Sequence, residues 1–403
     1  VATSTLQRHL DYDIDYAAGT IFFKEPVLSR DHDLNPIFIT ADYETGAQGA
    51  EDYIYGGRAY GRLQNGDIEI GTSLVHEGQN TVESDLVGID AKLKLTDNLT
   101  FKGEWASTET TTPIINTEGD AWLAEIEHRS QRFDLTAYMR EQETGFGLGQ
   151  QNASESGTRK FGTDLRYRVS QKIDVDAEFY QQENLATDIK RMVEEATVNY
   201  HDKHYSLSAG LRHAEDEQIT GTTETSDQIT FGGNYHVTEK LDLTLRHEQS
   251  IDNNENRDYP TRTAIGANYK LNRSVSLFAE QEITEGDSAD TANTRIGLNA
   301  TPWNGGQIRT SMEQNLSEAG RRIFGNLGLL QTWQINPKLS LNFSVDRSQV
   351  LSGLNSSSIH PDQPPASGSS EDFTALSTGF SYREHDWTFD TRAEYRTSDT
   401  EDK

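Results

Sequence analysis

A short β-hairpin pattern recurs along most of this chain and limits the folds open to it. In residues 226–249, apolar side chains stand at every second position on both sides of a turn at 238–240. Leu243 and Leu245, for example, flank the polar Thr244. Because successive strand side chains point to opposite faces of a sheet, such a hairpin has one apolar and one polar face. A soluble sandwich could also contain a hairpin of this kind, so the number of repeats decides the fold.

The pattern predicts about ten hairpins, or roughly twenty to twenty-one strands, each near the length of a membrane β-strand. Short turns alternate with longer polar connections such as residues 213–227 and 351–372. Short turns at one end and long loops at the other are typical of membrane β-barrels. The sequence therefore predicts an all-β, transmembrane, antiparallel up-and-down β-barrel of roughly 20 or more strands. The short turns are expected at 64–66, 96–98, 129–131, 170–172, 201–204, 238–240, 272–273, 303–306, 336–338 and 383–386.

Composition is compatible with such a barrel and excludes several other classes of protein. Hydrophobic residues make up 33% of the 403 residues, and no run approaches the roughly 18 apolar residues of a membrane helix. A membrane strand needs an apolar residue only at every second position, so low mean hydropathy is no objection. The net charge of −29 argues against nucleic acid as a partner. Cysteine is absent, which excludes disulfides and thiolate metal sites.

The polar face carries too many charges for a packed interior. Buried charges must be paired or solvated, so we expect this face to line a wet lumen crossed by ion pairs between neighbouring strands. Candidate lumen-lining residues are Lys92, Lys94, Arg166, Arg168, Asp174, Asp176, Asp242, Arg246, Arg309, Glu313, Asp390 and Arg392.

Aromatic residues gather within a few positions of the short turns. Tyr and Trp concentrate at the two interfaces of membrane barrels, where an amphipathic ring sits at the level of the lipid headgroups. The alternative is the general preference of aromatic residues for strands, which would scatter them along each strand. Candidate girdle residues are Tyr167, Tyr200, Tyr205, Tyr235, Tyr269, Trp303, Trp333 and Trp387.

The two ends of the chain differ from the repeat. Residues 1–44 are expected to form a small N-terminal β unit on the periplasmic side that leads into the barrel, with residues 37–43 as a possible first wall strand. The barrel itself is assigned to residues 45–403. Beyond Tyr395 the chain continues into acidic residues and not into a terminal aromatic strand. A first strand at 37–43 and a last strand that ends near Tyr395 give an odd number of strands. Because bacterial barrels normally close with an even number, we expect at least one further strand.

In architecture, residues 45–403 resemble a Gram-negative outer-membrane β-barrel, porin-like or of the large surface-protein type. The opening segment is similar to one found just before or within large surface-protein barrels, and this second resemblance implies location more than activity. The residues that carry this resemblance are Tyr12, Ile14, Asp15, Tyr16, Gly19, Ile21 and Phe23.

The predicted function is a conduit in the outer membrane, either a porin-like pore for solutes or a sleeve around a partner polypeptide. The alternative is a membrane anchor or scaffold of a surface complex, including the barrel of an extracellular electron-transfer conduit. In that case a partner would carry the haems, since the chain has no Cys-x-x-Cys-His. Expected partners are outer-membrane lipid and lipopolysaccharide, with a second protein in or under the lumen as an option.

No catalytic residue, cofactor or metal site is predicted. The sequence has no Gly-x-Ser-x-Gly motif, and its histidines are scattered over different hairpins. The acidic runs 252–256 and 215–217 could hold Ca²⁺, but the first lacks the glycine and terminal Glu spacing of an EF-hand loop. We interpret both runs as solvated loops.

Overall fold

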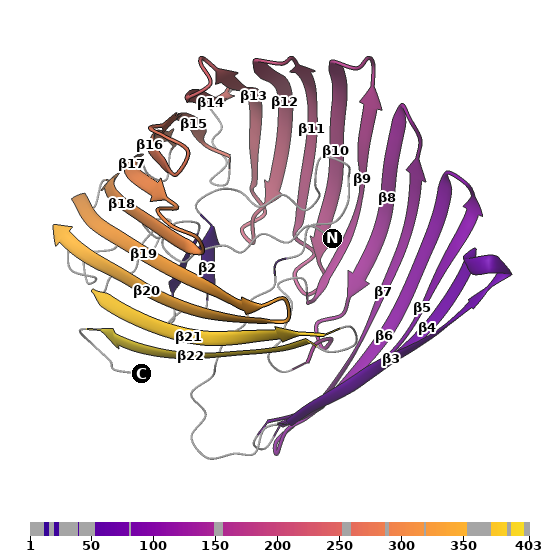
Figure 1. Ribbon diagram of the computed structural model, residues 1–403. Coiled ribbons are helices and arrows are strands. Elements are labelled where there is room, and N and C mark those ends of the chain that lie inside the picture. Colours follow the sequence, from indigo (N-terminus) through magenta and orange to yellow (C-terminus); the bar gives the residue numbers. More distant parts are fainter. Residues whose placement is uncertain are drawn as a thin grey trace.

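The computed structural model describes residues 12–15, 20–23, 39, 53–79, 82–148, 156–251, 259–286, 290–317, 320–352, 372–384 and 388–398. These residues form antiparallel β-strands and one short 3-10 turn, η1 (Gln64–Gly66). Figure 1 shows the main sheet curving continuously from β3 to β22 in the order of the sequence. No helix among the described residues is long and apolar enough to cross a membrane.

Twenty strands, β3 to β22, make up this sheet, and β1 (Tyr12–Asp15) and β2 (Thr20–Phe23) form a separate hairpin. The bounds are β3 (Tyr53–Leu63), β4 (Ile68–Gln79), β5 (Val82–Thr96), β6 (Leu99–Thr111), β7 (Asn116–Arg129), β8 (Phe133–Gln142), β9 (Thr158–Arg168), β10 (Ile173–Asn184), β11 (Lys190–His201), β12 (Tyr205–Glu217), β13 (Thr223–His236), β14 (Leu241–Ser250), β15 (Thr261–Lys270), β16 (Val275–Glu285), β17 (Thr291–Ala300), β18 (Gly306–Ser317), β19 (Gly320–Asn336), β20 (Leu339–Ser352), β21 (Phe373–Arg383) and β22 (Thr388–Ser398).

The strand order is that of a closed barrel, in which β22 is the neighbour of β3. Each strand from β3 to β22 pairs antiparallel with the next along the chain. This architecture confirms the predicted all-β, antiparallel, up-and-down barrel.

The alternation in sequence gives the sheet two chemically different faces. On one, here called the apolar face, large hydrophobic side chains stand exposed: Leu207, Phe231, Leu245 and Ile265 are 47–56% exposed. Leu207, Leu245 and Ile265 lie in one cross-strand row from β12 to β15, with Gly233 as its β13 member, and Phe231 lies two residues before Gly233 on the same face. The opposite, polar face carries most of the buried polar side chains of the strands, whereas large buried apolar side chains are few. An exposed apolar surface around a closed barrel is stable in lipid and not in water.

The tight turns depend on residues suited to unusual backbone conformations. Asn65 in η1 has φ 58°, a left-handed conformation that Asn adopts more readily than most residues. Gly305, between β17 and β18, has φ 75°, and a Cβ there would lie 2.0 Å from the carbonyl oxygen of Thr332. Only glycine fits at this position without displacing the backbone.

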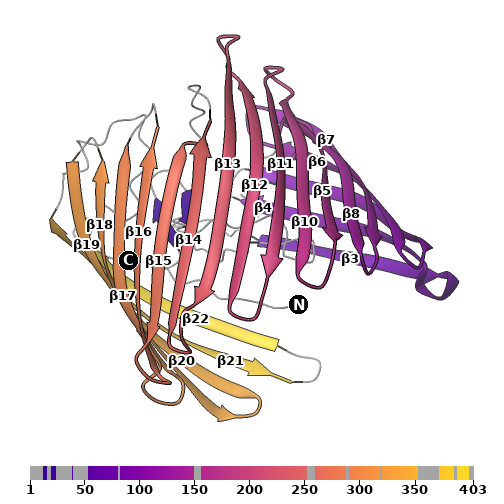
Figure 2. The same cartoon turned by 90° about the horizontal axis from the view of Figure 1, so that it is seen from above.

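The strict sorting of loops expected from the sequence is partly wrong. At the end away from the tight turns, only two residues separate β4 from β5 and β18 from β19, and four separate β6 from β7. At this end the strands are longer than predicted, so residues that were predicted to lie in loops belong to strands. Figure 2 shows the hairpins β10–β11 and β12–β13 projecting beyond their neighbours at this end, here called the loop end.

The expected N-terminal β unit stays a prediction. Of residues 1–44, the structure describes the β1–β2 hairpin, which pairs Tyr12 with Phe23 and Asp15 with Thr20. Figure 1 draws it on the concave side of the sheet. Its periplasmic position and the domain boundary at residue 44 stay predictions. Of the expected wall strand at 37–43, only Ile39 belongs to the described residues. The described barrel already has an even number of strands, so parity does not require a further one.

Candidate functional site on the polar face

A buried ion-pair network occupies the polar face of β9 to β11 near the tight turns. The Nε of Arg166 donates to an Asp176 carboxylate oxygen at 2.6 Å and lies 3.9 Å from an oxygen of Asp174. Asn199 donates to both carboxylates, at 3.1 and 2.7 Å, and His201 lies 3.0 Å from Asp174. Arg166 is 5% exposed and Asp174 is 8% exposed. Charges so deeply buried are tolerated because each has several partners.

We expect Arg166→Gln to lower the free energy of unfolding in lipid by about 1–3 kcal/mol, because it leaves the buried Asp174 and the partly exposed Asp176 without their guanidinium. The matched control is Arg246→Gln on the same face, where Arg246 is exposed beside Gly232 and Ala264. The control should change stability by less than about 0.5 kcal/mol. Equal effects of the two substitutions would contradict a network that stabilises the wall.

Other predicted lumen residues also lie in cross-strand contacts on the polar face. Arg168 pairs with the buried Asp134 at 2.7 Å. Asp242 contacts His236 at 2.5 Å and Lys270 at 3.2 Å. Glu313, which is 4% exposed, accepts a hydrogen bond from Asn326 at 3.2 Å. Charges of opposite sign thus meet across neighbouring strands, as the alternation of charged residues predicts.

The remaining predicted lumen residues share the same face with fewer described contacts. Lys92 lies cross-strand from Glu69 on one side and from Lys102 on the other. Lys94 contacts Asp97 at 3.1 Å in the turn that follows. Arg309 lies opposite Asn299. Asp390 and Arg392 belong to β22, but their side chains lie outside the described set.

The predicted girdle residues cluster at the end of the tight turns and, with one exception, on the apolar face. Six of them alternate in register with apolar side chains, and Tyr200 stacks on Tyr205 at 5.7 Å between ring centroids. Trp303 lies in the turn after β17 and donates from its indole nitrogen to Gln331. Trp387 lies outside the described residues. The six are Tyr167, Tyr200, Tyr205, Tyr235, Tyr269 and Trp333.

Aromatic residues also stand on the polar face, where the sequence pattern had not been used to predict any. Tyr138 and Tyr180 stand on this face, each beside a cation: Arg140 Cζ lies 5.6 Å from the centre of the Tyr138 ring. Lys160 Nζ lies 4.1 Å from the centre of the Tyr180 ring. Counting in steps of two from the charged residues of the same strands would have placed both tyrosines here.

Two loop segments from the loop end also fold onto the polar face. The amide of Gly147 donates to the buried Thr108 hydroxyl at 3.0 Å, and Leu148 is 6% exposed. On β13, the buried Gln228 side chain donates to the carbonyl oxygens of Tyr259 and Pro260 at 2.7 and 2.9 Å. These segments narrow the space that the polar face surrounds, and local sequence patterns give no indication of such long-range contacts.

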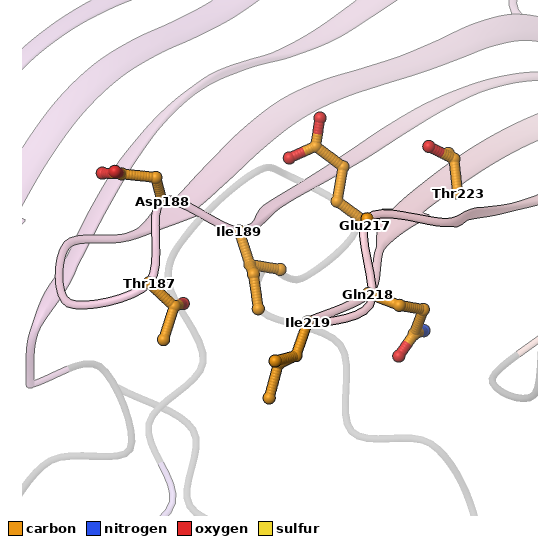
Figure 3. Close-up of a pocket in the computed structure, with 8 residues that line it drawn as sticks. Thr187, Asp188, Ile189, Glu217, Gln218, Ile219 and Thr223 are labelled. Atoms are coloured by element: carbon orange, nitrogen blue, oxygen red, sulfur yellow. The ribbon is translucent and has the colours of Figure 1, made fainter.

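A small recess lies between the tips of the two projecting hairpins (Figure 3). Loop residues 187–189 line one side, and residues 217–219, 221 and 223 line the other. In the acidic run beside it, each carboxylate has its own partner: Glu215 contacts His213, Asp216 binds Arg191 and Glu217 accepts from the Lys190 amide. The described residues include no group of His, Cys, Asp or Glu arranged to hold a metal ion. The run 252–256 lies outside the described residues.

Ion pairs also connect neighbouring turns at the other end of the barrel. Lys172, between β9 and β10, lies 3.0 Å from Asp202, between β11 and β12. The hydrogen bond from Lys172 lowers the pKa of Asp202 below its ordinary value. Lys338 and Glu384 pair in the same way between the last two turns, which lowers the pKa of Glu384. These exposed pairs hold adjacent turns in register, although each contributes little to stability.

Neither a protein-family model nor a curated protein sequence matches the chain. Solved structures do share its fold. The siderophore receptor PirA from Pseudomonas aeruginosa is 9% identical with a TM-score of 0.58, over 87% of this chain and 72% of the receptor. The FrpB iron transporter (F5-1 variant) from Neisseria meningitidis is 9% identical with a TM-score of 0.56, over 86% and 75%.

A mutant of the ferric enterobactin receptor PfeA from Pseudomonas aeruginosa is 10% identical with a TM-score of 0.55, over 86% of this chain and 72% of that one. At such low identity the likeness establishes the fold. These neighbours are outer-membrane receptors, so the fold is the predicted one, a Gram-negative outer-membrane β-barrel. The exposed apolar face around the barrel independently fits this location, because it requires a lipid surrounding.

Proposed function

We propose that this protein is an outer-membrane transport barrel, through which solutes cross along a lumen lined by the polar face. The observation that carries the proposal is the paired charge of that face, which includes Arg166 with Asp176, Arg168 with Asp134, and Arg262 with Glu282. Paired charges of both signs along an inner wall, together with exposed charges such as Arg246, fit a lumen that contains water. A wet interior is the property that a solute path needs.

Barrel size supports the same function. Barrels of 16–18 strands leave an aqueous channel, and 22-stranded outer-membrane transporters enclose a plugged lumen. With twenty strands, this barrel lies between these classes. The structural neighbours are named as receptors and transporters of iron compounds, which supports transport as the class of activity and gives no support to catalysis.

The girdle assignment belongs to the same proposal. Tyr167, Tyr235 and Tyr269 are 42–51% exposed on the apolar face beside the tight turns. A tyrosine ring there would place its body against lipid and its hydroxyl at the headgroups. The adjacent apolar band would contact the acyl chains, and the loop end would contact lipopolysaccharide.

Single-channel recording in planar bilayers tests the transport function. We expect the purified barrel to give discrete conductance steps. Arg246→Glu, on the polar face, should raise the permeability of cations relative to anions, because it replaces a lumen cation by an anion. Leu245→Ala, the neighbouring residue on the apolar face, is the control and should leave the selectivity unchanged.

The same purified barrel distinguishes the transport function from the second candidate function, a sleeve or scaffold. This candidate is favoured by the two loop segments that narrow the lumen, through Gly147 and Tyr259. A barrel that stays electrically silent, transports no small solute into liposomes and co-purifies in fixed ratio with another polypeptide would replace the transport proposal by the sleeve.

A further inference from the structure

The recess between the two projecting hairpins, β10–β11 and β12–β13, lies at the far tip of the loop end (Figure 2, Figure 3). It has a volume of about 340 Å³. This is at the low end of the range for sites that enclose a small molecule, so the recess suits a single long side chain.

Hydrogen bonds fix the walls of the recess. On the first hairpin, the side-chain oxygen of Asn184 accepts from the Thr187 amide at 3.1 Å. On the second, the backbone of residues 218–222 closes a turn with hydrogen bonds of 2.7 and 2.8 Å. The Lys190 amide donates to a Glu217 carboxylate oxygen at 3.1 Å and so connects the two hairpins. Because both walls are already in place, little conformational entropy is lost when a ligand binds between them.

The recess has an apolar end and an acidic end. Ile189 lines it from the first hairpin, and Ile219, which is 85% exposed, lines it from the second. Figure 3 shows these two side chains on one side and the carboxylates of Asp188 and Glu217 on the other. A ligand that fills the recess therefore meets both apolar surface and negative charge.

The two tips carry more negative charge than their own cations neutralise. Residues 183–191 and 215–224 contain six carboxylates and two cations, which gives a net charge of −4. Of the two cations, Lys190 lies 4.0 Å from Glu183, and Arg191 donates to Asp216 at 2.8 Å. Within the described ranges, neither Asp188 nor Glu217 takes part in an ion pair. The six carboxylates are Glu183, Asp188, Glu215, Asp216, Glu217 and Glu224.

Charge and shape together select the occupant. An excess of negative charge repels phosphates and carboxylates, so a lipopolysaccharide head group or an acidic solute does not suit the recess. A lysine or arginine side chain suits both ends, since its methylene stem packs on apolar surface while its charged head stays at the polar end. The recess therefore has the chemistry that recognises a long aliphatic cation.

We propose that the recess docks a basic segment of a partner protein, which inserts one lysine or arginine side chain between the two hairpins. The stem packs on Ile189 and Ile219, and the charged head pairs with Asp188 or Glu217. A protein is the occupant because the negative charge is spread over two tips that stand beyond their neighbours, where a large partner meets both at once. Complementary charge of this kind speeds the encounter and selects the partner. The docking site is separate from the lumen wall, so it does not depend on the transport function.

Fluorescence anisotropy of the fluorescein-labelled peptide Gly-Lys-Leu-Lys-Gly tests this proposal on the unaltered barrel in non-ionic detergent. We expect the peptide to bind. Replacing both lysines by norleucine, which keeps the stem and removes the charge, should weaken binding about tenfold. Replacing both by 2,3-diaminopropionate, which keeps the charge and shortens the stem, should weaken it about threefold.

Three results with these probes would overturn the proposal. The first is no binding of the lysine peptide. The second is equally tight binding of the norleucine peptide, which would remove the role of charge. The third is binding of free 1,5-diaminopentane as tightly as the peptide in a competition assay, because the recess would then take a small amine and not a protein segment.

Variants locate the docking site. Asp188→Asn combined with Glu217→Gln should weaken binding of the lysine peptide about threefold to tenfold, since each exposed ion pair contributes little. Asparagine is suitable at position 188 because Asp188 has φ 58°, a left-handed conformation that Asn also adopts. Ile219→Ser should weaken binding about threefold, because it removes apolar surface from the recess.

Matched controls lie on the β6–β7 hairpin at the same end of the barrel. Glu109→Gln combined with Glu118→Gln removes two exposed carboxylates there, and Ile114→Ser removes an isoleucine that is 95% exposed. Both controls should bind the lysine peptide like the unaltered protein. If the controls lose as much binding as the recess variants, or if the recess variants lose none, the peptide is held by the general acidity of the barrel and the docking site is wrong.

Discussion

Leu243→Arg is expected to lower the free energy of unfolding in lipid by about 1–2 kcal/mol, because a lipid-facing arginine costs less toward the interface than at the bilayer midplane and Leu243 lies cross-strand from the girdle residue Tyr235. Leu243 is 39% exposed on the apolar face of β14, cross-strand from Tyr235 and Ala267. Reversible unfolding by denaturant in lipid vesicles measures the change.

Thr244→Arg, one residue further along β14, is the matched control. Thr244 is exposed on the polar face, between Asn234 and Gly266, where an arginine can extend into water. Its effect should stay within about 0.5 kcal/mol. If both substitutions destabilise the barrel equally, the assignment of the two faces is wrong, and with it the lumen.

The fold could be predicted from the sequence because a strand has a period of two residues. Alternation over a few positions, as around Leu243, is enough to specify a strand, its faces and its turn, without knowledge of any distant contact. Repetition then selects the barrel, since a large number of hairpins with an exposed apolar face has few other stable arrangements. The predicted turn at 238–240, for example, falls between β13 and β14.

The charged wall could be predicted only in part. Composition and period place Arg166 and Asp176 on one face, but the exact pairing depends on the register between β9 and β10, which is set by the turn and by both neighbouring strands. The row of three carboxylates on β9 to β11 depends on two registers at once. No alternation within a single strand indicates that Asp164, Glu178 and Glu195 lie side by side.

Loop contacts were beyond prediction for a different reason. Tyr259 is held by Gln228, which lies 31 residues earlier in the chain. This contact involves one side-chain amide and one backbone carbonyl group, and neither has a sequence pattern of its own. The predicted loops were too long for a related reason. At the loop end the strands continue beyond the apolar band, and there the alternation of apolar and polar residues is lost. Polar residues such as His213 and Asp227 pair on the outer surface of this part of the strands.

The orientation of the barrel can be tested without background labelling, because the chain contains no cysteine. Outer-membrane barrels keep short turns on the periplasmic side and longer connections outside. Ile219, at the tip of the projecting β12–β13 hairpin, is 85% exposed, and Glu239 is exposed in the turn between β13 and β14 at the opposite end. In intact cells, a membrane-impermeant maleimide should label Ile219→Cys fully and spare Glu239→Cys.

Permeabilising the outer membrane should then expose Glu239→Cys to the reagent, which serves as the control that its thiol is reactive. The two sites lie at opposite ends of β13, so the barrel cannot present both to the same compartment while it spans the membrane. Labelling of Glu239→Cys but not Ile219→Cys in intact cells would mean that the barrel is inserted the other way, with the loop end facing the periplasm. Equal labelling of both in a soluble fraction without detergent would mean that the apolar face is covered by something other than lipid.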